Sequence, residues 1–175
     1  MTGTLRDRLR ARQLPTAVVR LPADPAGYAA AEQYFDAATR ALQLAQARQV
    51  PDLGPYEQAV KDATAAVEGQ AVEVFTLRCL APADWEALIT EHPASDEQRK
   101  QGWQWDVVEF RPALLAEAVV APEGEKALSE SDWRFLAEQG QLTVGELDLL
   151  FATAVNLQTR QPQVSVGKGS AGTPS

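Results

Sequence analysis

A repeat of small and apolar residues in the first half of the chain constrains its fold more than any other feature. The repeat follows Asp24-Pro25, a capping carboxylate directly before a first-turn proline, which is a typical beginning of a helix. Its members recur three and four positions apart, as along a coiled-coil seam, at Tyr28, Ala31, Phe35, Ala38, Leu42 and Ala45. Residues 50–55 (VPDLGP) interrupt the pattern, and a second amphipathic helix is predicted between Tyr56 and Gly69. Two helices with so short a connection predict an antiparallel hairpin.

Two stretches rich in β-branched residues flank this hairpin. Residues 16–21 (TAVVRL) precede it and residues 72–80 (VEVFTLRCL) follow it, and both are predicted to be strands. Their positions allow them to pair at the base of the hairpin. Upstream, Leu5 and Leu9 in an Arg-rich stretch predict a short amphipathic helix that Pro15 ends.

Several short helices with explicit caps are predicted in the second half. The first begins at Pro82 and ends near His92. Capping boxes at Ser95–Gln98 and Thr143–Glu146 begin two more, because a hydroxyl and a side chain three residues later satisfy each other's free amides. Another helix is predicted to begin at Ser129.

Between these helices, the segment 103–110 (WQWDVVEF) is predicted to be extended or irregular. Phe110-Arg111-Pro112 then opens a helix that continues through Val119.

Together the patterns predict a mainly α fold with a minor β part, in which a helical hairpin flanked by two short strands precedes a compact bundle of short helices. We divide the chain into a basic N-terminal arm (1–14), a strand–hairpin–strand unit (15–80), a helical domain (81–160) and a tail (161–175). The tail is rich in Gly and Ser, so we expect it to be flexible.

The charge of the chain argues against nucleic acid as a partner. The 175 residues carry a net charge of −8. Four arginines against one aspartate give residues 1–14 a charge of +3, which leaves −11 for the remainder. Nucleic-acid binding depends on Lys and Arg that displace counterions, and an acidic chain supplies few of them. No apolar run approaches the roughly 20 residues of a transmembrane helix, so we expect no membrane partner.

We find no catalytic, cofactor-binding or metal-ligating residues in the sequence. One cysteine, Cys79, and one histidine, His92, exclude an intramolecular disulfide and a usual zinc site. Cys79 is interpreted as a small buried residue of a strand and His92 as a capping or loop residue, since no activating neighbours accompany them. Four carboxylates near helix beginnings are interpreted as partners of the helix dipole: Glu130, Asp132, Glu146 and Asp148. We therefore expect a protein that is not an enzyme and uses no cofactor.

Candidate partner-binding residues come from two parts of the sequence. Trp85 and Trp133 lie on apolar helix faces and are expected in the core. Trp103 and Trp105 share one side of a segment predicted to be extended, and large aromatics in such positions anchor interfaces. The hairpin seam offers either the core of the hairpin or a groove for a partner helix. Its large candidate residues are Tyr28, Phe35 and Leu42.

A series of short motifs follows in order over residues 72–160. In chain order they are a strand bearing Phe75 and Arg78, a Trp-x-x-Leu helix from Trp85, the stop Glu91-His92-Pro93, the run Phe110-x-Pro112-x-Leu114-Leu115, and Gly145-Glu146-Leu147 before a last Leu- and Phe-containing helix ending near Asn156. In order and spacing these motifs resemble the tail assembly chaperones of long-tailed (siphovirus-type) actinobacterial phages and prophages.

The resemblance implies a non-enzymatic morphogenetic factor that acts in the host cytoplasm and is absent from the mature virion. Such a chaperone coats the long helical tape measure protein and helps tail tube subunits to polymerise around it. The implied partners are the tape measure protein and the tail tube protein, together with self-association. The alternative is a structural virion protein, such as a minor tail or head-to-tail connector component. A small acidic regulatory or antitoxin-like binding module comes third, and an enzyme last.

Overall fold

The computed structural model describes residues 4–160, within which eight helices accompany one antiparallel sheet of three strands. In chain order the elements are α1 (Leu5–Arg10), β1 (Thr16–Pro22), α2 (Pro25–Ala47), α3 (Gly54–Glu68), β2 (Val72–Arg78), α4 (Pro82–Glu91), α5 (Asp96–Lys100), α6 (Val107–Ala118), β3 (Val119–Val120), α7 (Glu130–Glu138) and α8 (Val144–Thr159). The predicted mainly α fold with a minor β part is confirmed. The tail expected over residues 161–175 lies outside the described residues. Within residues 4–160, none of the helices has the length and apolar character needed to cross a bilayer.

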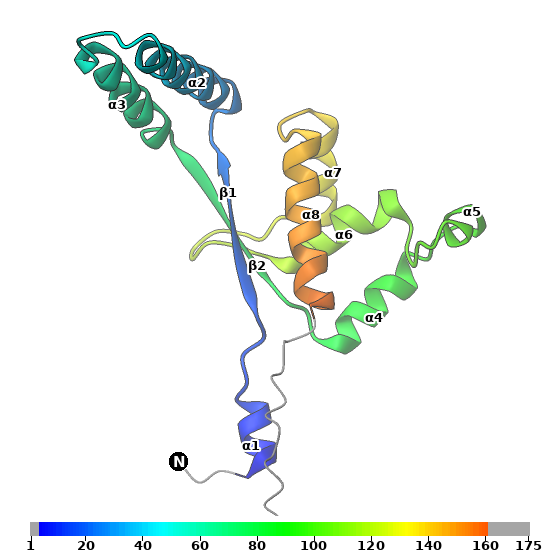
Figure 1. Ribbon diagram of the computed structural model, residues 1–175. Coiled ribbons are helices and arrows are strands. Elements are labelled where there is room, and N and C mark those ends of the chain that lie inside the picture. The colour runs from blue at the N-terminus through cyan, green and yellow to red at the C-terminus, as the bar shows by residue number, and fades with distance from the viewer. Residues whose placement is uncertain (1–3, 161–175) are drawn as a thin grey trace, which may run out of the picture.

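An antiparallel ribbon of β1 and β2 joins the α2–α3 hairpin to the rest of the protein. Every residue of β1 pairs with one of β2, from Thr16 opposite Arg78 to Pro22 opposite Val72. Figure 1 shows that this ribbon carries the hairpin away from the other helices. We call the hairpin, residues 25–68, the arm, and residues 80–160 the body. The predicted pairing of the two strands at the base of the hairpin is confirmed.

Small side chains fill the seam between α2 and α3. Ala31, Ala38 and Ala45 are seven residues apart and buried on α2, and Ala63 of α3 is completely buried. Alanine has no side-chain rotamers to lose on burial and lets the two backbones approach closely. The Asp24 side chain caps the N-terminus of α2, as its sequence position predicts.

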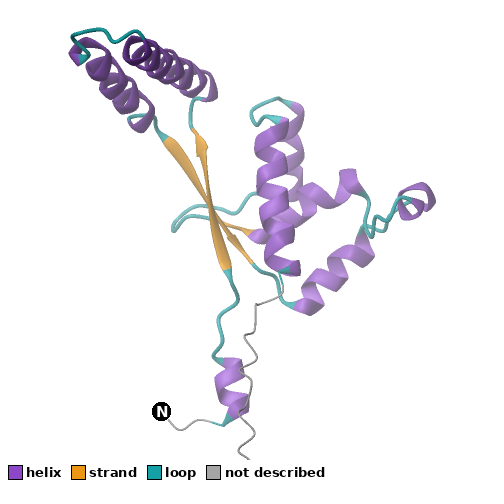
Figure 2. Ribbon diagram, in the orientation of Figure 1, coloured by secondary structure: helices purple, strands orange, loops and turns teal. Residues whose placement is uncertain are grey.

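The hydrophobic core lies where the helices of the body cover one face of the sheet, a layer visible in Figure 2. Alternate residues of a strand point to the same face, so Val19 and Leu21 of β1 and Leu77 of β2 enter this core. The largest fully buried side chains of the helices are Phe110, Leu114, Leu115, Trp133 and Leu150. The prediction that Trp133 is a core residue is confirmed, and Trp85 packs half-buried at the edge of the core.

The beginning of α6 differs from the prediction. The sequence predicts a helix that opens around Phe110, whereas α6 begins at Val107. Asp106 is the reason, because its side-chain oxygen accepts hydrogen bonds from the first free amides of the helix, including that of Val108 at 2.9 Å. Pro112 consequently lies inside the helix, where it has no N–H to donate to the Val108 carbonyl.

The end of α6 also differs from the prediction. The sequence predicts a helix through Val119, whereas α6 ends at Ala118. Val119 and Val120 form β3, opposite Leu77 and Thr76 of β2. β-branched residues suit this extended conformation, and pairing with β2 satisfies backbone groups that a further helical turn would otherwise use. The sheet therefore has a third strand beyond the two that flank the hairpin.

Capping boxes begin three helices of the body. Those predicted at Ser95–Gln98 and Thr143–Glu146 are confirmed for α5 and α8. A further box, Ser129–Asp132, begins α7 at the predicted serine. These local signals fix the residue at which each helix begins. The beginning of a helix in turn determines which of its residues face the core.

Candidate functional site

The predicted contact residues of the arm lie on the seam side of α2 and are partly buried. Tyr28, Phe35 and Leu42 are half-buried on α2, in the same stripe as the buried alanines. Their partial burial beside these alanines agrees with a role in the core of the hairpin, and the contact with a partner helix stays a prediction. The exposed large apolar side chains of α2 are Tyr34 and Leu44, which are 48% and 56% exposed.

The two predicted contact tryptophans lie in different environments. Trp105 is half-buried, stacks on Phe110 with ring centroids 4.7 Å apart, and meets Trp85 edge-on at 5.8 Å. Trp103 is 43% exposed, and its backbone N–H donates to the Gln98 carbonyl in the turn after α5. The structure thus does not present the pair as one exposed patch, and it brings neither tryptophan to the arm, as the separation of α5 from α2 in Figure 1 shows.

The lone histidine has a structural position. His92 is the C-terminal cap of α4, which confirms its interpretation as a capping or loop residue. Its carbonyl accepts a hydrogen bond from the Asp106 amide at 2.9 Å, and its ring meets Phe110 edge-on. The contact ties the end of α4 to the beginning of α6.

The lone cysteine lies beside the last helix. Cys79 is half-buried, and its thiol donates to the side-chain oxygen of Gln158 at 3.2 Å. The same oxygen accepts the Leu80 amide at 3.2 Å. Burial raises the pKa of the Cys79 thiol, because the charged thiolate is the form that loses solvation.

The carboxylates at the helix beginnings act as caps and ion-pair partners. Asp132 and Glu146 complete capping boxes, and hydrogen bonds from Ser129 hold the pKa of Asp132 below its usual value. Glu130 pairs with Arg134 of the same helix. Among residues 4–160 no group of His, Cys, Asp and Glu side chains is arranged to hold a metal ion.

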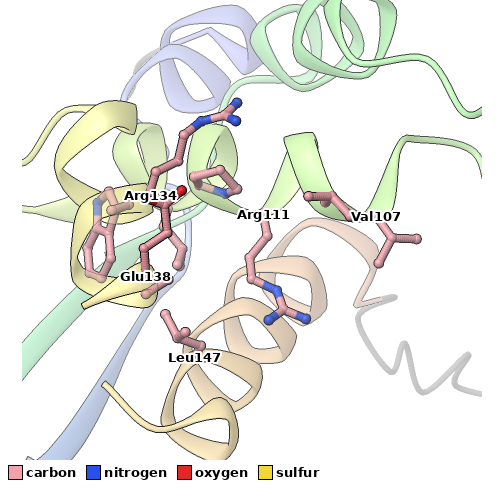
Figure 3. Close-up of a pocket in the computed structure, with 10 residues that line it drawn as sticks. Val107, Arg111, Arg134, Glu138 and Leu147 are labelled. Atoms are coloured by element: carbon pink, nitrogen blue, oxygen red, sulfur yellow. The ribbon is translucent and has the colours of Figure 1, made fainter. Parts of the chain in front are cut away.

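A pocket of about 300 Å³ lies between α6, α7 and α8. Its floor is mainly apolar, and charged side chains stand at its rim. The lining residues are Val107, Val108, Arg111, Pro112, Leu115, Trp133, Arg134, Ala137, Glu138 and Leu147. We call this hollow the α6–α8 pocket. Figure 3 shows the guanidinium groups of Arg111 and Arg134 directed to opposite sides of it.

Both arginines at this pocket are already paired with carboxylates. Arg111 contacts Asp148 of α8 at 2.8 Å, and its guanidinium lies 5.5 Å from the centre of the Phe151 ring. Arg134 binds Glu109 and Glu130 together. The hydrogen bond from Arg134 is the main cause that lowers the pKa of Glu109. The pocket therefore presents apolar floor and neutralised cations, a surface suited to an apolar side chain rather than to an anion.

Sequence reasoning missed this pocket because its parts come from three helices. The structure shows an exposed apolar residue at the rim, in the first turn after a helix N-cap. Val108, two residues after the Asp106 cap, is 72% exposed at the pocket rim. Val144, directly after the Thr143 cap of α8, is similarly exposed.

Comparison of the chain with protein families, with curated proteins and with solved structures found no match.

Proposed function

We propose that this protein is a non-enzymatic tail assembly chaperone of a long-tailed phage or prophage, which binds the tape measure protein in the host cytoplasm and promotes tail tube polymerisation around it. One observation of the structure supports the proposal above the others. A helical arm stands apart from the body on a two-stranded ribbon, so both of its helices offer surface to a partner. A second support is the order of motifs over residues 72–160, which resembles that of this family.

The outer surface of the arm fits a long helical partner. α2 has 23 residues, which gives a surface of about six turns for contact along one axis. Tyr34 and Leu44 supply exposed apolar area on it, and Asp36 and Arg40 an exposed polar pair 3.9 Å apart. Because residues 15–175 carry −11, we propose that the contacted coil is neutral or basic.

The test is co-purification of the full chain with a tape measure fragment after co-expression. Tyr34→Ala with Leu44→Ala should reduce recovery of the fragment while the circular dichroism spectrum stays unchanged, since both side chains are exposed. Leu149→Ala, which truncates an exposed leucine of the body, is the matched control and should bind as the natural chain does. Equal recovery with all three proteins would rule out the arm as the binding surface.

A second measurement separates the chaperone from a structural virion protein. We expect mass spectrometry of purified particles to detect the tube protein and the tape measure protein but not this chain. Stoichiometric recovery of the chain in particles would favour a minor tail or head-to-tail connector component instead.

A further inference from the structure

The N-terminal helix is short, and its first leucine is exposed. α1 has six residues, whereas isolated helices shorter than about 12 residues are marginal in water. Thr4 and Asp7 form a capping box at its beginning, with the Thr4 hydroxyl 2.7 Å from the Asp7 carboxylate. Leu5 is nevertheless 63% exposed, so most of its apolar surface stays in water. A surface that covers Leu5 would therefore stabilise α1.

The charge of α1 indicates what kind of surface would cover it. Arg6 and Arg8 are exposed, and none of the described carboxylates lies within ion-pair distance of either. Asp7 is already used by the cap. A cationic helix with an exposed leucine fits an apolar hollow with a negative rim.

The α6–α8 pocket has these two properties. Val108 exposes most of its side chain at the rim, next to an apolar floor that includes Leu147. The two arginines of the rim are neutralised by Asp148, Glu109 and Glu130. Glu138 also lines the pocket, and none of the described cations pairs with it. The rim and its partners therefore hold four carboxylates against two guanidinium groups.

We propose that α1 of one copy docks into the α6–α8 pocket of a second copy, with Leu5 on the apolar floor and Arg6 and Arg8, which follow it in the chain, toward the carboxylates of the rim. Figure 1 places α1 beyond the end of the ribbon that is opposite the arm, away from α7 and the top of α8, so the second copy is the occupant that fits. Two different surfaces then meet, so each contact is heterologous and joins the α1 end of one copy to the pocket of the next. The inference does not depend on the proposed function.

The test measures self-association of the full chain by sedimentation velocity and light scattering. We expect the natural chain to form oligomers whose size rises with concentration. Leu5→Asp removes the α1 side of the contact and Val108→Asp the pocket side, and each should raise the dissociation constant by about tenfold or more, since burying an unpaired charge is costly. Both residues are exposed in the single chain, so both variants should keep the natural circular dichroism spectrum.

Mixing the two variants tests whether α1 and the pocket are the two surfaces that meet. Leu5→Asp keeps an intact pocket and Val108→Asp an intact α1, so an equimolar mixture should form a one-to-one dimer although each variant alone is monomeric. Phe135→Asp, on an exposed residue of α7 outside the pocket, is the control and should associate as the natural chain does. A natural chain that stays monomeric at its highest soluble concentration, or a mixture that stays monomeric, would overturn the proposal.

Discussion

The ring of Trp105 lies on the ring of Phe110, with centroids 4.7 Å apart and planes inclined by 20°. Phe110 is completely buried, and Trp85 meets it edge-on from α4. Stacked and edge-on aromatic pairs each add about 0.5–1.5 kcal/mol beyond the area they bury. Trp105 therefore joins the segment after α5 to the core and serves the fold.

Truncation of Trp105 and of Trp103 should have unequal effects. Trp105→Ala should lower the free energy of unfolding by about 2 kcal/mol, less than the 3–5 kcal/mol of a fully buried tryptophan because the residue is half-buried. Trp103→Ala should change it by no more than about 0.5 kcal/mol, as is usual at exposed positions. Urea unfolding of the two single variants checks this, and equal losses would contradict the assignment of Trp105 to the core.

Enlarging an alanine of the arm seam should destabilise the arm and leave the body intact. Ala38→Leu puts three additional carbons where α2 meets α3, which should cost about 1–3 kcal/mol through overpacking. Because the arm packs mainly on itself, hydrogen exchange should accelerate in α2 and α3 but not in α6 or α8.

The neighbouring residue provides the control for this experiment. Ala37→Leu makes the same chemical change on the exposed side of α2 and should leave exchange in the arm unchanged. Acceleration throughout the body after Ala38→Leu would show that arm and body unfold as one unit.

Local signals predicted most of the secondary structure because the interactions behind them span three or four residues. Asp24 and Ser95 cap helices through amides that follow directly in the chain. The seam of the arm was predictable for the same reason, since its heptad spacing fixes one face of a helix. The beginning of α6 was not, because both Asp106 and Pro112 are plausible helix starts and only the structure shows which one acts.

Relationships between distant segments were not predictable from one sequence. Trp103 and Trp105 would share a side only if their segment were extended throughout. The turn that ties the Trp103 amide to Gln98, and the bridge between Trp105 and Pro93, instead direct the two residues to solvent and to the core respectively. The α6–α8 pocket needs side chains from three helices, and no spacing in the sequence encodes their meeting.

Removing the Arg134 guanidinium should raise the pKa of Glu109. The hydrogen bond from Arg134 holds that pKa below its ordinary value, so the ionised carboxylate stabilises the fold at neutral pH. This contribution is present above the unfolded pKa of about 4.3 and is lost as the pH falls through the lower folded pKa. Arg134→Met should therefore weaken the dependence of stability on pH on the acid side of about pH 4.

Carbon-13 NMR titration of the side-chain carboxyl groups checks this prediction. The pKa of Glu109 should move toward its ordinary value in Arg134→Met. Asp132 is an internal control, because its lowered pKa comes from Ser129 and should not respond. An unchanged Glu109 titration would mean that the ion pair does not persist in solution.

The half-buried Cys79 thiol should react with iodoacetamide more slowly than an exposed cysteine does. Burial raises its pKa, so less thiolate is present at pH 8 than in the unfolded chain, and the thiolate is the form that attacks iodoacetamide. Gln158→Ala should accelerate the reaction, because it removes the oxygen that accepts hydrogen bonds from the Cys79 thiol and the Leu80 amide. The same change should lower the free energy of unfolding by about 1 kcal/mol. Asn156→Ala, an exposed change on the same helix, is the control and should leave the rate unchanged. If folded Cys79 reacts as fast as the chain does in urea, α8 does not cover the end of β2 in solution.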